Sequence, residues 1–309
     1  MRWNQTTLAA LLLVLCSCAT APHVENASCD PLPGWEDIAN SARGNYLIFG
    51  ELHGSAEPPS ALYNYVCALS QSDDLPVLVA IEFDSATDDS FQTAWDAEPE
   101  EFRDVMLANV DSWGRRDDGV ASVAMFQMLQ NLHRLKSAGH EIDLVAFNGA
   151  KDEEQASRFS DLPGQEPHEA SQAENISVAA AAKTYAHVVI LVGNLHARKE
   201  PQDWDGVSWQ PMAMKLAEPE KVISLVQRDS GGEAWNCQLS PDALANQKGP
   251  ADIGPEDILC RDYPRRANKA FESGEPHMAL WDETHPGYRP GYDGFFFVGP
   301  INASPPVQR

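Results

Sequence analysis

Short apolar runs alternate along the chain with longer segments in which apolar residues recur every three or four positions. The runs predict buried strands over residues 46–50, 77–83, 141–147, 187–193, 222–227 and 294–298. The periodic segments predict helices over residues 60–69, 88–109 with a fresh start at Pro99, 120–138, 177–185 and 212–217. Alternating strands and helices predict an α/β fold, a single domain with a mostly parallel central sheet and helices on both faces.

Two regions lack both patterns. Residues 150–170 are polar and hold two prolines, so we expect an exposed insertion there. Residues 230–290 are rich in Gly, Pro and Asp. We expect them to form a loop-rich C-terminal excursion from the same domain.

The pattern Gly-x-x-His occurs twice, each time after a predicted strand. It runs from Gly50 to His53 after the first strand and from Gly193 to His196 after a later one. Open α/β sheets bind their ligands at the carboxyl ends of the strands. The repeat therefore predicts that the two histidines share one pocket at that edge.

Carboxylates are expected to complete the pocket. Glu82 ends the strand over 77–83, and Glu51 lies two positions before His53. We expect these two glutamates and the two histidines to be catalytic. Binding or supporting roles are considered for Gly50, Glu57, Asp84, Arg115, Arg116, Gly193 and Asn194. A strand-end salt bridge or a solvated loop remains the alternative for the charged members of that set.

Two chemistries suit this set of side chains. A divalent metal held by His53, His196 and Glu82 would lower the pKa of a bound water. Without a metal, a His or Glu would act as general base on a water that attacks an ester or amide. The sequence does not favour a serine nucleophile, a phosphate loop or a dinucleotide site, because their glycine-containing motifs are missing.

Residues 1–17 have the features of a secretory signal. Arg2 precedes an apolar run over 8–15 that is too short to span a bilayer as a helix. The run leads into Leu-Cys-Ser-Cys, which is similar to a bacterial lipobox and predicts lipidation of Cys18. An ordinary signal cleaved near Ala19 or Ala21 is the alternative.

The lipoprotein interpretation sets the expected organisation. Residues 18–30 would be a tether and residues 31–309 the folded domain. The protein would then lie on the periplasmic face of a bacterial membrane, which we expect to be the outer membrane.

Four cysteines follow Cys18, an even number that suggests disulfides in an exported chain. Three connectivities are possible. We favour Cys29–Cys67 and Cys237–Cys260, because each pair lies within one region of the chain. Free buried cysteines are the alternative.

The chain is strongly acidic, with a formal net charge of −24. General electrostatic attraction to nucleic acid is therefore excluded, and anionic lipid surfaces would repel the protein. We expect contact with the membrane through a lipid anchor only.

The motifs resemble those of the superfamily that joins erythromycin esterases, ChaN-like haem-binding lipoproteins and Tiki (TraB) proteins, most closely a ChaN-like lipoprotein. The resemblance covers roughly residues 44–300 and rests first on the two Gly-x-x-His segments and on the strand ending in Glu82. Further similar segments are Asp118-Gly119 with Ser122, Ala124 and Met125, then residues 292–296 and 303–306.

Two positions depart from the family pattern. Val120 stands where an Arg is expected after Asp118-Gly119. Ala173-Glu174 and Val178-Ala179 stand where an Arg-Asp and a Met-Ala are expected. The lost cations weaken the expectation of full esterase activity and leave the His/His/Glu core intact.

The resemblance implies two functions. Some members hydrolyse macrolide esters without metal, Tiki proteins are described as metal-dependent proteases, and ChaN-like lipoproteins bind haem. We therefore expect a hydrolase-like site for a small-molecule ester or amide. The alternative is a haem- or iron-binding lipoprotein involved in iron uptake, with a His as axial ligand. The sequence lacks Cys-x-x-Cys-His, so covalent haem attachment is not expected.

Overall fold

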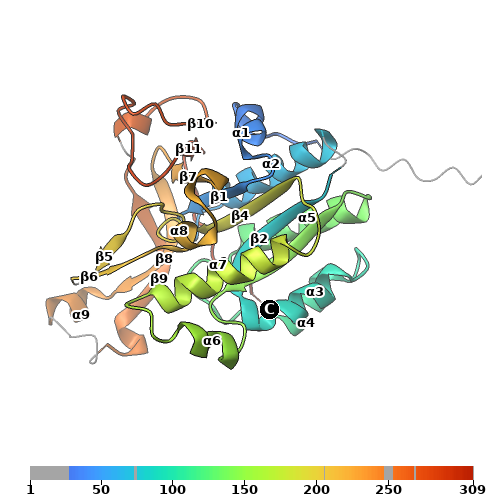
Figure 1. The fold of residues 1–309 in the computed structure, drawn as a ribbon. Helices are drawn as coiled ribbons and strands as arrows, with labels where there is room; N and C mark the ends of the chain where they lie inside the picture. The colour runs from blue at the N-terminus through green and yellow to red at the C-terminus, as the bar shows by residue number, and fades with distance from the viewer. Residues whose placement is uncertain (1–27, 73–74, 205, 247–252, 268, 309) are drawn as a thin grey trace, which may run out of the picture.

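The computed structural model describes residues 28–72, 75–204, 206–246, 253–267 and 269–308. Within them, seven strands form a central sheet in the order β10-β11-β7-β1-β4-β2-β3 (Figure 1). The strands are β1 (Tyr46–Glu51), β2 (Val77–Asp84), β3 (Ile142–Asn148), β4 (His187–Gly193), β7 (Val222–Arg228), β10 (His277–Leu280) and β11 (Gly294–Phe297). All neighbours pair in parallel except β10 with β11. The predicted α/β fold with a mostly parallel sheet is confirmed.

Helices cover both faces of this sheet (Figure 1). One face carries α1 (Trp35–Ala42), α2 (Glu57–Ser72), α3 (Asp88–Trp95), α4 (Phe102–Asn109) and α5 (Val123–Ser137). The other carries α7 (Glu166–Ala180) and α8 (Met212–Leu216). Successive side chains of β1 alternate between the two cores: Leu47 and Phe49 join the first, and Ile48 joins the second. Burial on both faces explains why the strands are continuous apolar runs.

The helix predicted over 88–109 is broken near Pro99 into α3 and α4, as expected. Helix α2 begins at Glu57, three residues before the predicted start at Ser60. Pro58 and Pro59 lie in its first turn, where the backbone N–H groups have no partner within the helix.

Residues 150–170 are mostly exposed, as predicted, but they form helices and not an irregular insertion. Asp152 caps α6 (Glu153–Phe159) by accepting the Gln155 N–H, and α7 begins at Glu166. Both helices were missed because α7 has buried residues of polar type as well as alanines, so the segment lacks a clear apolar stripe. The helix predicted over 177–185 is only the end of α7.

The excursion over 230–290 holds more regular structure than predicted. Strands β8 (Gly232–Leu239) and β9 (Ile258–Arg265) form an antiparallel hairpin, and α9 (Pro241–Ala245) follows β8. A second, short hairpin pairs β5 (Gln202–Trp204) with β6 (Val207–Trp209). The β8–β9 hairpin lies over the loop after β1, where the Trp235 N–H donates to the Gly54 carbonyl at 2.8 Å.

Both predicted disulfides are present. Cys29–Cys67 ties the residues before α1 to α2, and Cys237–Cys260 joins directly paired positions of β8 and β9. Two disulfides indicate an extracytoplasmic protein. No helix within the described residues is long and apolar enough to cross a membrane. The predicted signal, the tether up to residue 27 and Cys18 lie outside the described residues.

The segment from Ile301 to Val307, which we call the C-terminal strap, returns to the loop after β1. The Ser304 N–H donates to the Gly54 carbonyl at 2.8 Å, and the Ala56 N–H donates to the Asn302 carbonyl at 3.0 Å. In addition, the Pro305 carbonyl of the strap accepts the Val123 N–H, and the Val307 N–H donates to the Ala121 carbonyl. It thereby joins the loop after β1 to the start of α5.

Candidate functional site

His53 follows β1 in a turn whose backbone is held on both sides. The Leu52 N–H donates to Gln227 Oε1 at 2.7 Å, and Gly54 has a φ of +78° that favours glycine. The Glu51 carboxylate, which is buried, lies 2.9 Å from His53 Nδ1. This contact leaves Nε2 of the ring facing the neighbouring strands.

Glu82 lies between the two histidines, close to the end of β2. Its Oε2 accepts the Gly193 N–H at 2.6 Å and lies 3.2 Å from His53 Nε2. Its Oε1 lies 3.6 Å from His196 Nε2. The predicted His/His/Glu cluster therefore forms at the carboxyl edge of the sheet, because β4 pairs with β1 on one side and β2 on the other.

His196 is held by a carboxylate that sequence reasoning missed. Glu169, buried on α7, places Oε1 2.7 Å and Oε2 2.9 Å from His196 Nδ1. Its Oε2 also accepts the Met212 N–H at 2.7 Å. Each histidine thus has its Nδ1 on its own buried glutamate and its Nε2 toward the shared Glu82.

Two further polar residues of α7 were missed with Glu169. His168 stacks obliquely on His196, with 5.8 Å between the ring centroids. The Gln172 amide donates to His168 Nε2 at 2.9 Å, so the His168 proton lies on Nδ1. The sequence held a usable signal here, because positions 168, 169 and 172 share one face of any helix that contains them, and α7 does.

The glycines of the two motifs are required by close approach. A Cβ on Gly193 would lie 2.9 Å from His53 Nε2 and 3.5 Å from Glu82 Oε2. A Cβ on Gly50 would lie 2.7 Å from the Ala197 Cβ. Both predicted supporting roles are therefore steric: each glycine lets one histidine-bearing turn approach the other.

Opposing charges set the ionisation of the cluster. Burial alone would lower the pKa of His53, but the Glu82 and Glu51 carboxylates outweigh it and raise that pKa well above its ordinary value. Burial would raise the pKa of Glu82, yet His53 and His196 lower it to about 2. Burial likewise opposes Glu169 and Glu82 at His196, whose pKa is raised. Both ring nitrogens of His53 face carboxylates, so its imidazolium form is the one that the geometry favours.

His168 is shifted in the opposite direction. Burial and the nearby His196 lower the pKa of His168 below its ordinary value. His168 therefore favours its neutral form beside His196, whose pKa is raised.

The other predicted site residues lie around this cluster without entering it. Glu57 was expected to support His53, but its carboxylate accepts the Asn302 N–H at 3.1 Å. Asp84 is exposed and accepts the Ala86 N–H at 3.0 Å, because β2 becomes irregular after Ile81. The Asn194 backbone bridges the site, with its N–H on the Glu51 carbonyl at 2.9 Å and its carbonyl accepting the Tyr292 hydroxyl at 2.6 Å.

Arg115 and Arg116 are paired within their own loop. Arg115 lies 3.1 Å from Asp111, and Arg116 lies 2.6 Å from Asp118. No hydrogen bond or ion pair joins either arginine to the histidine cluster within the described residues. The loop still contacts the site through Gly119, where a Cβ would lie 2.8 Å from the Gly54 Cα.

The structure assigns no metal ligands. Among the described residues, no group of three or more His, Cys, Asp or Glu side chains is arranged so that it could hold a metal ion. His53 and His196 direct their Nε2 atoms at the Glu82 carboxylate itself, and their Nδ1 atoms are engaged by other glutamates.

No family model matches this sequence, and no curated protein matches it. Solved structures do match. A mutant of the erythromycin esterase EreC in its open conformation is 12% identical, with a TM-score of 0.58 over 87% of this chain and 94% of that chain. A Bacillus cereus protein is 11% identical, with a TM-score of 0.52 over 91% of this chain and 96% of that chain.

A succinoglycan biosynthesis protein is 10% identical, with a TM-score of 0.51 over 87% of this chain and 91% of that chain. At such low identity these likenesses concern the fold. The resemblance seen in the sequence is confirmed at that level: the chain has the fold of the erythromycin esterases.

Proposed function

We propose that this protein is an exported hydrolase that cleaves a small-molecule ester or amide with a water activated at the His53, Glu82 and His196 cluster. One observation carries the proposal. Two histidines, each fixed through Nδ1 by its own buried glutamate, direct their Nε2 atoms at one shared carboxylate. Carboxylate-fixed imidazoles of this kind are the usual groups for general acid–base catalysis.

His196 is the better candidate for the base. Its Nε2 lies 3.6 Å from Glu82, beyond hydrogen-bond distance, and its side chain is 22% exposed, so a water can reach it. Glu169 holds the Nδ1 proton and so leaves the Nε2 lone pair free in the neutral ring. His196 Nε2 takes a proton from the water as its oxygen attacks the carbonyl carbon.

His53 suits the acid role. Its ring carries protons on both nitrogens when it is paired with Glu51 and Glu82, and its raised pKa keeps it charged at neutral pH. As the carbon–oxygen or carbon–nitrogen bond breaks, His53 Nε2 gives its proton to the departing group. Glu82 stays ionised throughout and stabilises the positive charge that passes between the two rings.

Haem binding by a histidine axial ligand is supported less well. An axial ligand needs a free Nε2 in a mostly apolar pocket. Here three glutamates surround the two rings, so the immediate surroundings are charged and not apolar. These contacts favour proton transfer over iron ligation.

Hydrolysis of 4-nitrophenyl acetate by the purified protein tests the proposal. We expect His53→Ala and His196→Ala each to lower kcat by at least about 100-fold, which is typical of a lost general acid or base. His140→Ala is the matched control, because His140 precedes β3 at the opposite edge of the sheet. Equal rates in all four proteins would reject catalysis by the cluster.

We also propose that the protein is a lipoprotein of the outer membrane, anchored through Cys18. The lipobox-like segment and the two disulfides support export and anchoring. Cell fractionation tests this: Cys18→Ala should move the protein from the membrane into the soluble periplasmic fraction. An unchanged membrane distribution would reject lipidation at this residue.

A further inference from the structure

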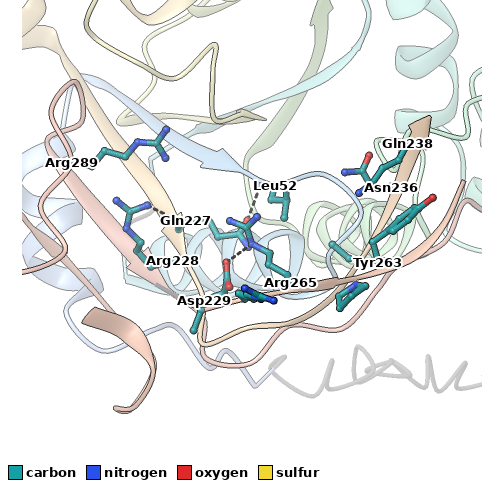
Figure 2. Close-up of a pocket in the computed structure, with 13 residues that line it drawn as sticks. Leu52, Gln227, Arg228, Asp229, Asn236, Gln238, Tyr263, Arg265 and Arg289 are labelled. Atoms are coloured by element: carbon teal, nitrogen blue, oxygen red, sulfur yellow. Dashed lines mark hydrogen bonds and ion pairs between the residues drawn. The ribbon is translucent and has the colours of Figure 1, made fainter. Parts of the chain in front are cut away.

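A cavity of about 450 Å³, part of whose lining is labelled in Figure 2, is lined by Leu52 next to His53, by four arginines and by one carboxylate. The charged residues are Arg228, Arg265, Arg266, Arg289 and Asp229. Positive charge is unusual here, because the whole chain carries a formal net charge of −24. The cavity is therefore a local exception to the charge of the protein.

Only one of these arginines has a carboxylate partner within the described residues. Arg265 Nε lies 2.9 Å from Asp229 Oδ2, as the dashed line in Figure 2 marks. Asp229 is buried and also accepts the Gly231 N–H at 3.1 Å. The Asp229 charge is thus neutralised by Arg265, so the other three arginines can interact with a ligand or with solvent.

Arg228 is the most informative member, since it is only 8% exposed and forms no ion pair within the described residues. Its Nη atoms make two long contacts with carbonyls, 3.4 Å to Gln227 and 3.3 Å to Gly287, and its Nε has no partner. Burial and the neighbouring Arg289 lower its pKa to about 10, so it is still charged at neutral pH. The nearest carboxylate that acts on this charge, Asp229, is already paired with Arg265, so a bound anion would compensate a buried cation that is costly to leave unpaired.

A second unpaired donor faces the same cavity. Gln227 is 5% exposed, and its Oε1 accepts the Leu52 N–H, which leaves its Nε2 without a hydrogen-bond partner in the described structure. The guanidinium of Arg228 packs on the rings of Phe271 and Trp281, 5.7 Å from each centroid. This packing fixes the cation in place, so the donors are already arranged for an oxyanion.

The cavity is joined to both histidine turns. Leu52 lines the cavity and directly precedes His53. On the other side, Arg289 stacks on Tyr292, whose hydroxyl donates to the Asn194 carbonyl just before His196. Neighbouring strands are about 4.8 Å apart, so the end of β7 lies roughly 10 Å from the end of β4. One small molecule can span that distance.

We propose that this arginine cavity binds an oxyanion of the substrate, a carboxylate or a phosphate, while the scissile bond lies at the histidines. The inference rests on the proposed hydrolase function and adds the substrate class: anionic esters or amides. Charge-assisted hydrogen bonds to arginine give both affinity and orientation. The cavity is larger than one ion, so it also accommodates the substituent that carries the anion.

Calorimetric titration with inorganic phosphate and with glutarate tests the cavity without any need for catalysis. We expect saturable binding of at least one of them, weakened by added salt and reduced roughly 10- to 100-fold in Arg289→Gln. Arg228→Met should abolish binding, and Arg289→Gln, which removes a less buried side chain, keeps the test valid if the first variant fails to fold. Arg134→Gln, which removes an arginine from α5, should bind as the unaltered protein does.

Kinetics then relate the cavity to the reaction. The kcat/KM for the 4-nitrophenyl monoester of glutarate should exceed that for 4-nitrophenyl acetate by at least about tenfold, and Arg289→Gln should remove the preference. Arginine-dependent anion binding without any ester hydrolysis would reject the proposed hydrolase and support the anion site. Hydrolysis of both esters at equal rates, with neither phosphate nor glutarate bound, would overturn the anion site.

Discussion

Replacement of Glu169 by glutamine should disable His196 without disturbing the fold. Glu169 Oε2 accepts the Met212 N–H at 2.7 Å, so the amide oxygen of the variant must stay at that position. The amide nitrogen then takes the place of Oε1, 2.7 Å from His196 Nδ1, and donates to it. His196 can accept this bond only if its proton moves to Nε2.

The wrong tautomer removes the base. With its proton on Nε2, His196 cannot accept a proton from water, and Glu82 Oε1 at 3.6 Å favours that tautomer further. In other histidine–carboxylate pairs the corresponding change costs on the order of 10⁴ in kcat. A loss of that size is about 5.4 kcal/mol of transition-state stabilisation at 1.36 kcal/mol per tenfold. Loss of the charge-assisted hydrogen bond should cost about 1.5–3 kcal/mol of stability, which leaves most domains folded.

Two measurements check this prediction. The kcat for 4-nitrophenyl acetate should fall by about 10⁴, and the nitrogen NMR shifts of His196 should show the proton transferred from Nδ1 to Nε2. Glu174→Gln is the control, because it makes the same chemical change on the same helix at a residue that binds Arg158. A folded Glu169→Gln protein with kcat within a few-fold of the original, or with its Nδ1 proton in place, would refute the assignment of His196 as base.

Three further outcomes follow from the same geometry. Activity should rise with pH as His196, whose pKa is raised, becomes neutral, and it should fall at higher pH as His53 loses its proton. Both limbs of the pH–rate profile should therefore lie above 6.5, and a profile that is flat from pH 6 to pH 9 would contradict this. Gly193→Ala should lower kcat roughly tenfold, because a Cβ placed 2.9 Å from His53 Nε2 must displace that ring by a few tenths of an ångström from Glu82; unchanged kinetics would show that the 3.2 Å contact is not needed. Exhaustive chelation should leave activity unchanged, and haemin should give no Soret shift that depends on His53 or His196. Near-stoichiometric zinc or manganese in the purified protein that is lost in His53→Ala would instead support metal ligation.

The sequence was sufficient for the six parallel strands of the central sheet and for the convergence of the two histidines. Strands buried on both faces are continuous apolar runs, and a parallel sheet brings their carboxyl ends to one edge. Gly50 to His53 and Gly193 to His196 could therefore be placed together before their pairing was known. Glu82 followed from the same argument because it ends the strand beside β4.

The partners of these residues could not be predicted in the same way. Glu169 reaches His196 from a helix whose buried residues are partly polar, so periodicity gave no reason to place that helix there. Arg228 ends β7, which was predicted as a strand, but Arg289 lies in a segment that the sequence described as a loop, so their convergence could not be predicted. Asp84 was wrongly expected at the site. In a regular strand its side chain would point to the same side as that of Glu82, but the irregularity after Ile81 turns it to solvent. Sequence pattern locates elements, whereas contacts between elements depend on packing that it does not encode locally.

The C-terminal strap has a consequence for the folding of the protein during its synthesis. Glu57 and Asn302, which bind each other beside the loop after β1, are 245 positions apart. Contacts so distant in sequence form late, because a long stretch of chain must close before they stabilise anything. While the ribosome is still making residues before 302, the loop that carries His53 lacks the bonds from Gly54 and Ala56 to the strap. A nascent chain therefore holds its two histidines on strands that have no finished pocket, and the site is complete only once the strap has folded back onto the loop after β1.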